Sequence, residues 1–216
     1  MFTGIIQEIG KVIRVQPLGA GISLSVDAPR SSKDLRVNDS VSVNGVCQTV
    51  VEKWQNSFSV VAVEETLAKT TFRDLRTESP VNIELAMQLG DRLGGHLVSG
   101  HIDTVGVVEA IEQRETSWLF RILIPSGFER YVIPVGSIAI DGVSLTVASI
   151  EGSIVAISII PHTMENTIFS TYSVKSKVNL EFDMIGKYIE RLAVTSKSIN
   201  SESISADQLR IWGYNT

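Results

Sequence analysis

Cysteine, serine, histidine and aspartate residues that could carry chemistry stand where two similar parts of this chain differ. The segment NGVCQTV (Asn44–Val50) recurs 97 residues later as DGVSLTV (Asp141–Val147), so that Cys47 corresponds to Ser144. A thiolate can act as a nucleophile, and a hydroxyl beside a base can take part in proton transfer. The same comparison gives further differences between the two parts: His101 for Ile5, Asp141 for Asn44, His162 for Glu65 and Asp183 for Ala86. Two similar pockets with unlike reactive groups would suit two similar ligands held in different roles.

Further matching blocks indicate that a whole domain is duplicated. Val81–Glu84 (VNIE) recurs as Val178–Glu181 (VNLE), and Thr3–Ile6 (TGII) matches Ser99–Ile102 (SGHI). One single-residue change in length reconciles these blocks. The sequence therefore predicts two domains of about 90 residues, each large enough to bury a modest core.

Each candidate residue also has a purely structural interpretation. A single cysteine between strand and turn is usually a small buried hydrophobe. His101 beside Gly100 could be a hydrogen-bonded turn residue. Ser144 and Thr146 alternate along a strand and therefore face the same side, where both could be structural hydroxyls.

Other kinds of site find little support in the sequence. Serine, histidine and aspartate could form a hydrolytic triad, but no GxSxG elbow surrounds Ser144. Three histidines and one cysteine without close ligand spacing argue against a zinc site. No P-loop or GxGxxG motif occurs, so we expect no metal and no nucleotide cofactor.

The composition is that of an ordinary globular protein, with 44% hydrophobic and 20% charged residues among 216. A net charge of −5 argues against nucleic acid or an anionic membrane as partner. One cysteine allows no intrachain disulfide. The sequence shows no signal-peptide pattern and no apolar run of roughly 18 residues, so we expect a cytoplasmic protein.

Short alternating stretches rich in Val and Ile, separated by Gly, Asn, Asp or Pro, predict β-strands in both halves. These stretches are Gly21–Asp27, Val41–Val43, Phe58–Val63, Val81–Leu85, Trp118–Ile124, Ser137–Ile140, Ile154–Ile160 and Val178–Phe182. About six strands per half fit a small closed barrel, because closure removes exposed edges. In each half a helical turn should follow a threonine N-cap, Thr66 before Leu67–Phe72 and Thr163 before Met164–Phe169.

We therefore predict an all-β fold with a C-terminal helix, made of two tandem six-stranded Greek-key barrels. The expected boundaries are residues 1–87 for the first barrel, 88–96 for a glycine-rich linker, 97–184 for the second barrel and 185–206 for the helix and tail. Apolar residues in Met184–Val194 recur on one helical stripe. That stripe could pack on its own barrel or on the same helix of other subunits. Leu209–Tyr214 is more apolar than is usual for a disordered tail, and nothing in the sequence explains this composition.

Four blocks together resemble the riboflavin synthases of the duplicated-barrel type: MFTGII, NGVCQTV, GGHLVSGHID (Gly94–Asp103) and IDGVSLTV. The resemblance covers roughly residues 1–194. It implies conversion of two molecules of 6,7-dimethyl-8-ribityllumazine into riboflavin and 5-amino-6-ribitylaminouracil, by transfer of a four-carbon unit without a metal or redox cofactor. It also implies a homotrimer joined by the C-terminal helices, with active sites between the first barrel of one subunit and the second barrel of a neighbour. The trimer would either stand alone or sit inside a lumazine synthase shell.

The resemblance implies roles for particular residues. His101 with Ser144 and Thr146 would form the base, and Cys47 or a water polarised by Asp183 would activate the other lumazine. Phe2 would close or stack on a ring. Backbone groups meeting the pyrimidine edges would come from Gly4, Ile5, Ile6, Cys47, Gln48, Thr49, Gly100, His101, Ile102, Ser144, Leu145 and Thr146. Residues holding the ribityl chains would be Val61, Ala62, Val63, Glu64, Glu65, Thr66, Ser158, Ile159, Ile160, Pro161, His162 and Thr163.

The alternative is a non-catalytic lumazine- or flavin-binding protein of the same fold. Such relatives are expected to lose the reactive positions, which this chain keeps. One local departure from the family is Val135, at a position that is often basic. If that charge serves binding, Arg130 or a neighbour must replace it.

Overall fold

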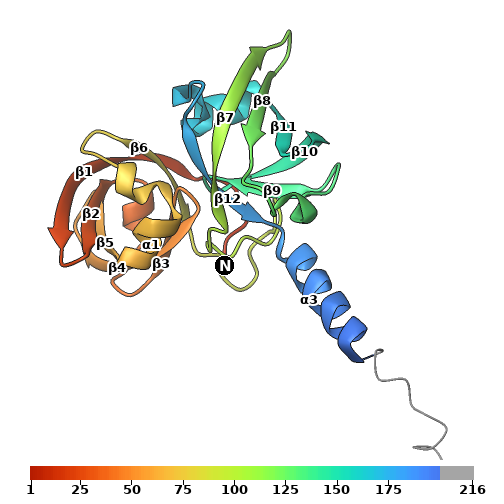
Figure 1. Ribbon diagram of the computed structural model, residues 1–216. Coiled ribbons are helices and arrows are strands. Elements are labelled where there is room, and N and C mark those ends of the chain that lie inside the picture. Colours follow the sequence, from red (N-terminus) through yellow and green to blue (C-terminus); the bar gives the residue numbers. More distant parts are fainter. Residues whose placement is uncertain (200–216) are drawn as a thin grey trace, which may run out of the picture. The chain divides into compact units, whose positions relative to one another are not determined.

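The computed structural model describes residues 1–199, which fall into two units that are treated separately: Met1–Asp183 and the segment from Met184 onward. The first unit contains two closed antiparallel barrels (Figure 1). The first barrel has the order β1-β2-β5-β4-β3-β6, and its strands are β1 (Glu8–Leu18), β2 (Gly21–Asp27), β3 (Ser40–Val43), β4 (Val46–Lys53), β5 (Ser57–Ala62) and β6 (Pro80–Leu85). The second repeats this order with β7 (Thr104–Gln113), β8 (Trp118–Leu123), β9 (Ser137–Ile140), β10 (Val143–Glu151), β11 (Ile154–Ile159) and β12 (Lys177–Phe182). The Greek-key double barrel expected from the sequence is confirmed.

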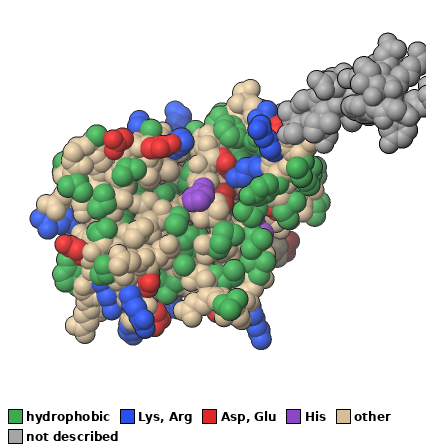
Figure 2. Space-filling view, turned by 90° about the horizontal axis from the view of Figure 1, so that it is seen from below, with side chains coloured by type: hydrophobic (Ala, Val, Ile, Leu, Met, Phe, Trp, Pro, Cys, Tyr) green, Lys and Arg blue, Asp and Glu red, His purple; other side chains and the backbone are tan. Residues whose placement is uncertain are grey.

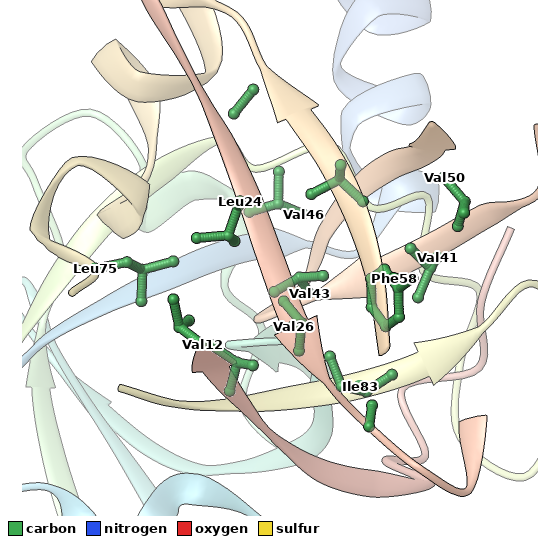
Figure 3. Close-up of a cluster of buried hydrophobic side chains, with 14 of the residues drawn as sticks. Val12, Leu24, Val26, Val41, Val43, Val46, Val50, Phe58, Leu75 and Ile83 are labelled. Carbon is green, nitrogen blue, oxygen red and sulfur yellow. The ribbon is translucent and has the colours of Figure 1, made fainter. Parts of the chain in front are cut away.

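Both barrels enclose an apolar core because alternate side chains of every strand point inward. Half of the residues in the first core are valines, and they pack with larger side chains such as Leu24, Phe58 and Ile83 (Figure 3). The second is richer in isoleucine and phenylalanine, and the Phe120 and Phe169 rings meet edge to face. Strand register shifts at equivalent places in the two barrels, after Val12, Val50, Val108 and Val147. Such bulges let the strands bend around a small barrel.

Each of the eight strands predicted from alternation is present, with ends displaced by no more than one residue. The ranges missed were those of β1, β4, β7 and β10, which are the longest strands, of 11, 8, 10 and 9 residues. Each of these strands contains exposed charged residues, which interrupt the apolar pattern.

The predicted threonine N-caps were wrong. Helix α1 (Glu64–Lys69) and helix α2 (Pro161–Asn166) begin before Thr66 and Thr163, which lie inside them. Acidic residues in the first turn of α1 and a proline at the start of α2 favour these earlier starts. The threonines that do cap are Thr70 and Thr167, whose hydroxyls accept the N–H of Phe72 and Phe169 in the following 3-10 helices.

Equivalent buried asparagines join the two barrels. Asn82 Nδ2 donates to the carbonyl oxygen of Asp141, and Asn179 Nδ2 donates to that of Asn44, each over 2.9 Å. Asn179 Oδ1 accepts the N–H of Thr71, and Asn82 Oδ1 accepts an N–H at the equivalent place in the second half. Both side chains have no exposed surface. The asparagine shared by the VNIE and VNLE blocks therefore holds the halves together.

Helix α3 (Met184–Ile199) begins where the sequence predicted and runs five residues beyond Val194. Its exposed apolar side chains form the predicted stripe: Ile185, Tyr188, Ile189 and Leu192, between 59% and 66% exposed. None of the helices within residues 1–199 is both long and apolar enough to cross a membrane. The expectations for Leu209–Tyr214, and for the end of the predicted 185–206 segment, fall outside the described residues.

Candidate functional site

The first half of the candidate site is a patch on the outer wall of the first barrel. Strands β4 and β5 pair with Val50 opposite Val60. Along β4 the side chains of Val46, Gln48 and Val50 are buried, so those of Cys47 and Thr49 face outward. Val61 is half-buried and Val63 is exposed where α1 begins. We call the outward-facing side chains of Cys47, Thr49, Val61 and Val63 the first-barrel patch.

The second barrel carries an equivalent surface. Strands β10 and β11 pair with Val147 opposite Ile157, and both of these side chains point into the core. Ser144 is half-buried, and Thr146, Ser158 and Ile160 are exposed. These four residues form the second-barrel patch. Cysteine in one patch thus matches serine in the other, as the repeat predicted.

Two short leader segments, Thr3–Ile6 and Ser99–Ile102, reach across to the opposite barrel. The N–H of Ser144 donates to the carbonyl oxygen of Gly4, and the N–H of Cys47 donates to that of Gly100, each over 2.8 Å. Both glycines have positive φ, and a Cβ on either would lie 2.5 Å from the Cβ of its partner. Only glycine permits this approach.

Buried carboxylates anchor the leaders to their own barrels. Glu84 accepts the N–H of Thr3 over 2.6 Å and that of Gly4 over 3.0 Å. Glu181 makes the equivalent bonds to Ser99 and Gly100, over 2.7 and 2.9 Å. Burial raises the pKa of the Glu84 carboxyl, although the bonds from its leader oppose this rise. Each leader is therefore fixed between its own last strand and the other barrel's patch.

Because each leader crosses to the opposite barrel, it determines which of the predicted site residues lie close together. Ile5 and Ile6 follow the glycine bonded to Ser144, and Ile6 packs against the second core. His101 and Ile102 follow the glycine bonded to Cys47, and Ile102 packs against the first core. Within one chain, His101 thus borders the first-barrel patch rather than Ser144.

Ser144 has a different histidine partner, which the sequence analysis missed. His96 Nδ1 lies 2.7 Å from Ser144 Oγ. Burial lowers the pKa of His96, while the negative charges of Asp183 and Glu181 act in the opposite direction. His96 escaped notice because the repeat aligns it with a position before Met1, so there was no first-half residue for comparison. His96 nevertheless lies within the GGHLVSGHID block, which the sequence already singled out.

Several predicted contact residues face away from the patches. Gln48, Ala62 and Ile159 point into the barrels and are at most 7% exposed, because side chains alternate along a strand. Leu145 packs against the second core. Only the backbone of these residues can meet a ligand at the outer wall. Glu64–Thr66 and Pro161–Thr163 lie in the first turns of α1 and α2, directly after the patches.

Phe2 occupies a buried position between the halves. Its N–H donates to the carbonyl oxygen of Val98, and it accepts from the Val98 N–H in return. The ring has no exposed surface and clusters with Val98 and Ala139, against which Cys47 and Ala86 pack. In this chain, Phe2 therefore supports the first-barrel patch from below, and its ring is not available to stack on a ligand.

The surface around the leader Thr3–Ile6 is hollowed, and exposed apolar side chains occur on this leader and in both patches. A hollow of about 400 Å³ is lined by Thr3, Ile5, Glu84, Arg92 and neighbouring residues. Ile5, Val63 and Ile160 are each about half exposed, at 48%, 52% and 55%. Figure 2 shows hydrophobic side chains exposed among polar and charged ones over one whole face. Within residues 1–199, no three His, Cys, Asp or Glu side chains gather in a way that could hold a metal ion.

Val135, the local departure noted in the sequence, has an unusual backbone conformation. Its φ is +63°, and its side chain is 80% exposed. The equivalent residue of the first half is Asn38, which tolerates this left-handed conformation (φ +77°) far better than a β-branched residue. Nearby, the Arg130 guanidinium lies 4.9 Å from the centre of the Tyr131 ring.

Asp141, another position where the halves differ, lies buried at the junction of the barrels. Its Oδ1 accepts the N–H of Asn179 over 3.0 Å, and its Oδ2 accepts the hydroxyl of Tyr172. Burial raises the pKa of Asp141 to about 7, although these bonds oppose the rise, and it raises the pKa of Tyr172 as well. The first half has Asn44 and Leu75 at the equivalent places. This pair belongs to the barrel junction and not to either patch.

Comparison with known proteins finds the same duplication in this chain. The Lumazine binding domain family matches residues 3–86 and 99–183. Riboflavin synthase of Actinobacillus pleuropneumoniae is 40% identical over 215 residues, 99% of this chain and 100% of the relative. That of Bacillus subtilis (strain 168) is 40% identical over 191 residues, 88% of this chain and 89% of the relative. The crystal structure of LumP complexed with 6,7-dimethyl-8-(1'-D-ribityl) lumazine superimposes with a TM-score of 0.77 at 26% identity, over 84% of this chain and 98% of that one. With two lumazine-binding domains and this identity over nearly its whole length, the chain belongs to the riboflavin synthase family.

Proposed function

We propose that this chain converts two molecules of 6,7-dimethyl-8-ribityllumazine into riboflavin and 5-amino-6-ribitylaminouracil. The observation that carries the proposal is the pair of equivalent patches with unlike reactive groups, on a chain 40% identical to riboflavin synthases. The similar surfaces of the two patches suit two copies of one ligand. Unlike groups suit the two roles, since one lumazine gives up four carbons and the other accepts them.

The chemistry follows from the acidity of the lumazine C7 methyl group. Removal of its proton leaves a carbanion that the ring carbonyls delocalise, so a weak base suffices. We assign this step to the second-barrel patch, where Ser144 and Thr146 face outward. Activation of the second lumazine at C7 falls to the first-barrel patch, where Cys47 or a water can add. Holding the two rings face to face can supply about 7–11 kcal/mol of the barrier reduction.

We further propose that each working site is shared between two subunits. The two patches lie on different barrels of one chain, and His101 borders the patch that contains Cys47. A first-barrel patch that faces the second-barrel patch of a neighbour would bring His101 and Asp183 to both substrates. The exposed apolar stripe of α3 supports assembly into a homotrimer, because four large apolar side chains of one helix face would gain from burial. A cytoplasmic location and a lumazine synthase shell stay predictions of the sequence.

The alternative function is that of a lumazine carrier. LumP structures hold lumazine and riboflavin on this fold at 26% identity. The reactive set of Cys47, His101 and Ser144 in this chain favours the enzyme, since a carrier needs none of these groups.

The deciding experiment supplies the purified protein with 6,7-dimethyl-8-ribityllumazine alone and follows the absorbance of riboflavin. We expect one riboflavin for every two lumazines consumed, with no added cofactor. Tight binding without conversion would overturn the enzyme in favour of the carrier. His101→Ala should lower turnover strongly and leave lumazine binding measurable.

A further inference from the structure

A second hollow, of about 500 Å³, lies on the first barrel beside the 3-10 turn Ser31–Lys33. Ser31, Asp34 and Leu85 are among the residues that line it. No side chain of either patch lines it. The turn follows the end of β2 that pairs with the start of β5, whereas the first-barrel patch includes the end of β5. We call this separate feature the first-barrel hollow.

The same place in the second barrel is filled by aromatic rings. At the offset of 97 residues, the counterparts of Ser31, Asp34 and Leu85 are Phe128, Tyr131 and Phe182. The backbone supports this match, because in both halves the N–H at the second of these positions donates to the carbonyl oxygen at the first, over 3.2 and 3.0 Å. The Phe128 and Tyr131 rings lie 5.5 and 5.8 Å from the Phe182 ring, centre to centre. The first barrel therefore lacks the rings that cover the second barrel at these positions.

The first-barrel hollow keeps a cation at the place where one accompanies these rings. In the second barrel, the Arg130 guanidinium lies 4.9 Å from the centre of the Tyr131 ring. Its counterpart in the first half is Lys33, which lines the hollow. A lysine ammonium group is attracted to the face of an aromatic ring in the same way. A ring bound in the hollow would thus meet a positive charge, as well as the apolar surface of Leu85.

A buried hydroxyl group at the hollow also lacks a partner. Ser31 is 4% exposed, and its Oγ has no hydrogen-bond partner within residues 1–199. Such a group is costly, because it has given up its hydrogen bonds to water. The neighbouring Ser32 hydroxyl is unpaired as well, but Ser32 does not line the hollow. A ligand in the hollow could therefore form a hydrogen bond with Ser31 and not with Ser32.

We propose that the first-barrel hollow binds a small molecule whose aromatic ring bears a hydroxyl or similar hydrogen-bonding group. The ring would take the place that Phe128 and Tyr131 fill in the second barrel, and its polar group would pair with the Ser31 hydroxyl. The volume lies in the usual range of ligand pockets, about 300–1,000 Å³. Because the hollow is separate from both patches, this inference goes beyond the function proposed above and does not depend on it.

A titration of the full-length protein with p-cresol, which is the tyrosine side chain as a free molecule, tests the site. We expect the backbone ¹H–¹⁵N NMR signals of Ser31–Asp34 and Leu85 to shift, with a Kd of about 1 mM, the scale for so small a ligand. Toluene, which has the ring without the hydroxyl, should bind about fivefold more weakly. Absence of these shifts at ten times that concentration, or equal affinity for both probes, would overturn the proposal.

The two neighbouring serines provide a matched pair of variants. Ser31→Ala should bind p-cresol about fivefold more weakly than the unmodified protein does. Its melting temperature without ligand should not fall, since no hydrogen bond is lost. Ser32→Ala should bind p-cresol as the unmodified protein does. An unchanged p-cresol affinity in Ser31→Ala, or an equal loss in Ser32→Ala, would contradict a ligand bond at Ser31.

The second barrel supplies the residues that should close the site. The triple variant Ser31→Phe, Asp34→Tyr, Leu85→Phe should fill the hollow with its own rings, keep its melting temperature and bind no p-cresol. A folded triple variant that still binds p-cresol would refute the site, and the serine pair decides the question if the triple variant does not fold. Its sedimentation should match that of the unmodified protein. A changed assembly state would show that another protein chain supplies the ring, which would overturn a small-molecule site.

Discussion

Replacing Asp141 with Asn should change how the stability of this protein depends on pH. The carboxyl is 2% exposed and lies between Asn179 and Tyr172. An asparagine, which the first half carries at the equivalent position 44, can still accept the Asn179 N–H through Oδ1. Its amide can donate to the Tyr172 oxygen. The variant therefore keeps two hydrogen bonds and removes one titrating group.

The magnitude follows from the shifted pKa. A carboxyl with an ordinary pKa of 3.8 titrates at about 7 in the folded chain. The folded state therefore binds this proton more tightly than the unfolded state, and stability falls as pH rises between these two values. The whole effect is about 4 kcal/mol at 1.36 kcal/mol per pH unit, and about 3 kcal/mol of it lies between pH 5 and pH 8. The pKa of Tyr172 is raised well above 10, so the tyrosine stays protonated throughout this window.

Urea unfolding followed by far-UV circular dichroism at pH 5 and pH 8 measures the difference. The free energy of unfolding of the unmodified protein should fall by about 3 kcal/mol more than that of Asp141→Asn over this interval. Asp34→Asn, at an exposed carboxyl, is the matched control and should follow the unmodified protein. Parallel curves for the unmodified protein and Asp141→Asn would refute the assignment of a buried, titrating carboxyl.

Three further changes test other parts of the structure. Val135→Asn should raise the free energy of unfolding by about 1 kcal/mol, because it relieves a β-branched residue in the left-handed region; an unchanged melting temperature would show that the site is unstrained. Gly4→Ala should cost roughly 2 kcal/mol or more and lower turnover, since its Cβ would lie 2.5 Å from that of Ser144, and a variant of normal stability and activity would contradict the close approach. Removal of all residues after Asp183 should give monomers of low activity in sedimentation and turnover assays, and a fully active monomer would exclude the shared site.

Local pattern and internal comparison predicted much of this structure. Alternation located eight strands, and the repeat singled out Cys47 and Ser144, whose side chains prove to face the same outer wall of their barrels. What escaped prediction depends on contacts distant in sequence. His96 has no first-half residue for comparison, and the bond between Asp141 and Tyr172 crosses 31 positions. The crossing of each leader to the opposite barrel could not be predicted either. The sequence does not show which segment of the chain packs against a given glycine.

That crossing has an evolutionary consequence. Each patch is bordered by the leader of the other half. A chain of half this length could therefore complete the surroundings of its patch only by pairing with a second copy of itself. In such a pair the bonds of Gly4 to Ser144 and of Gly100 to Cys47 would become one bond, repeated by true twofold symmetry. The present protein then corresponds to a fused homodimer. After fusion, each half could mutate independently of the other. A symmetric homodimer must have the same residue at both equivalent positions, so it could not combine a cysteine in one patch with a serine in the other.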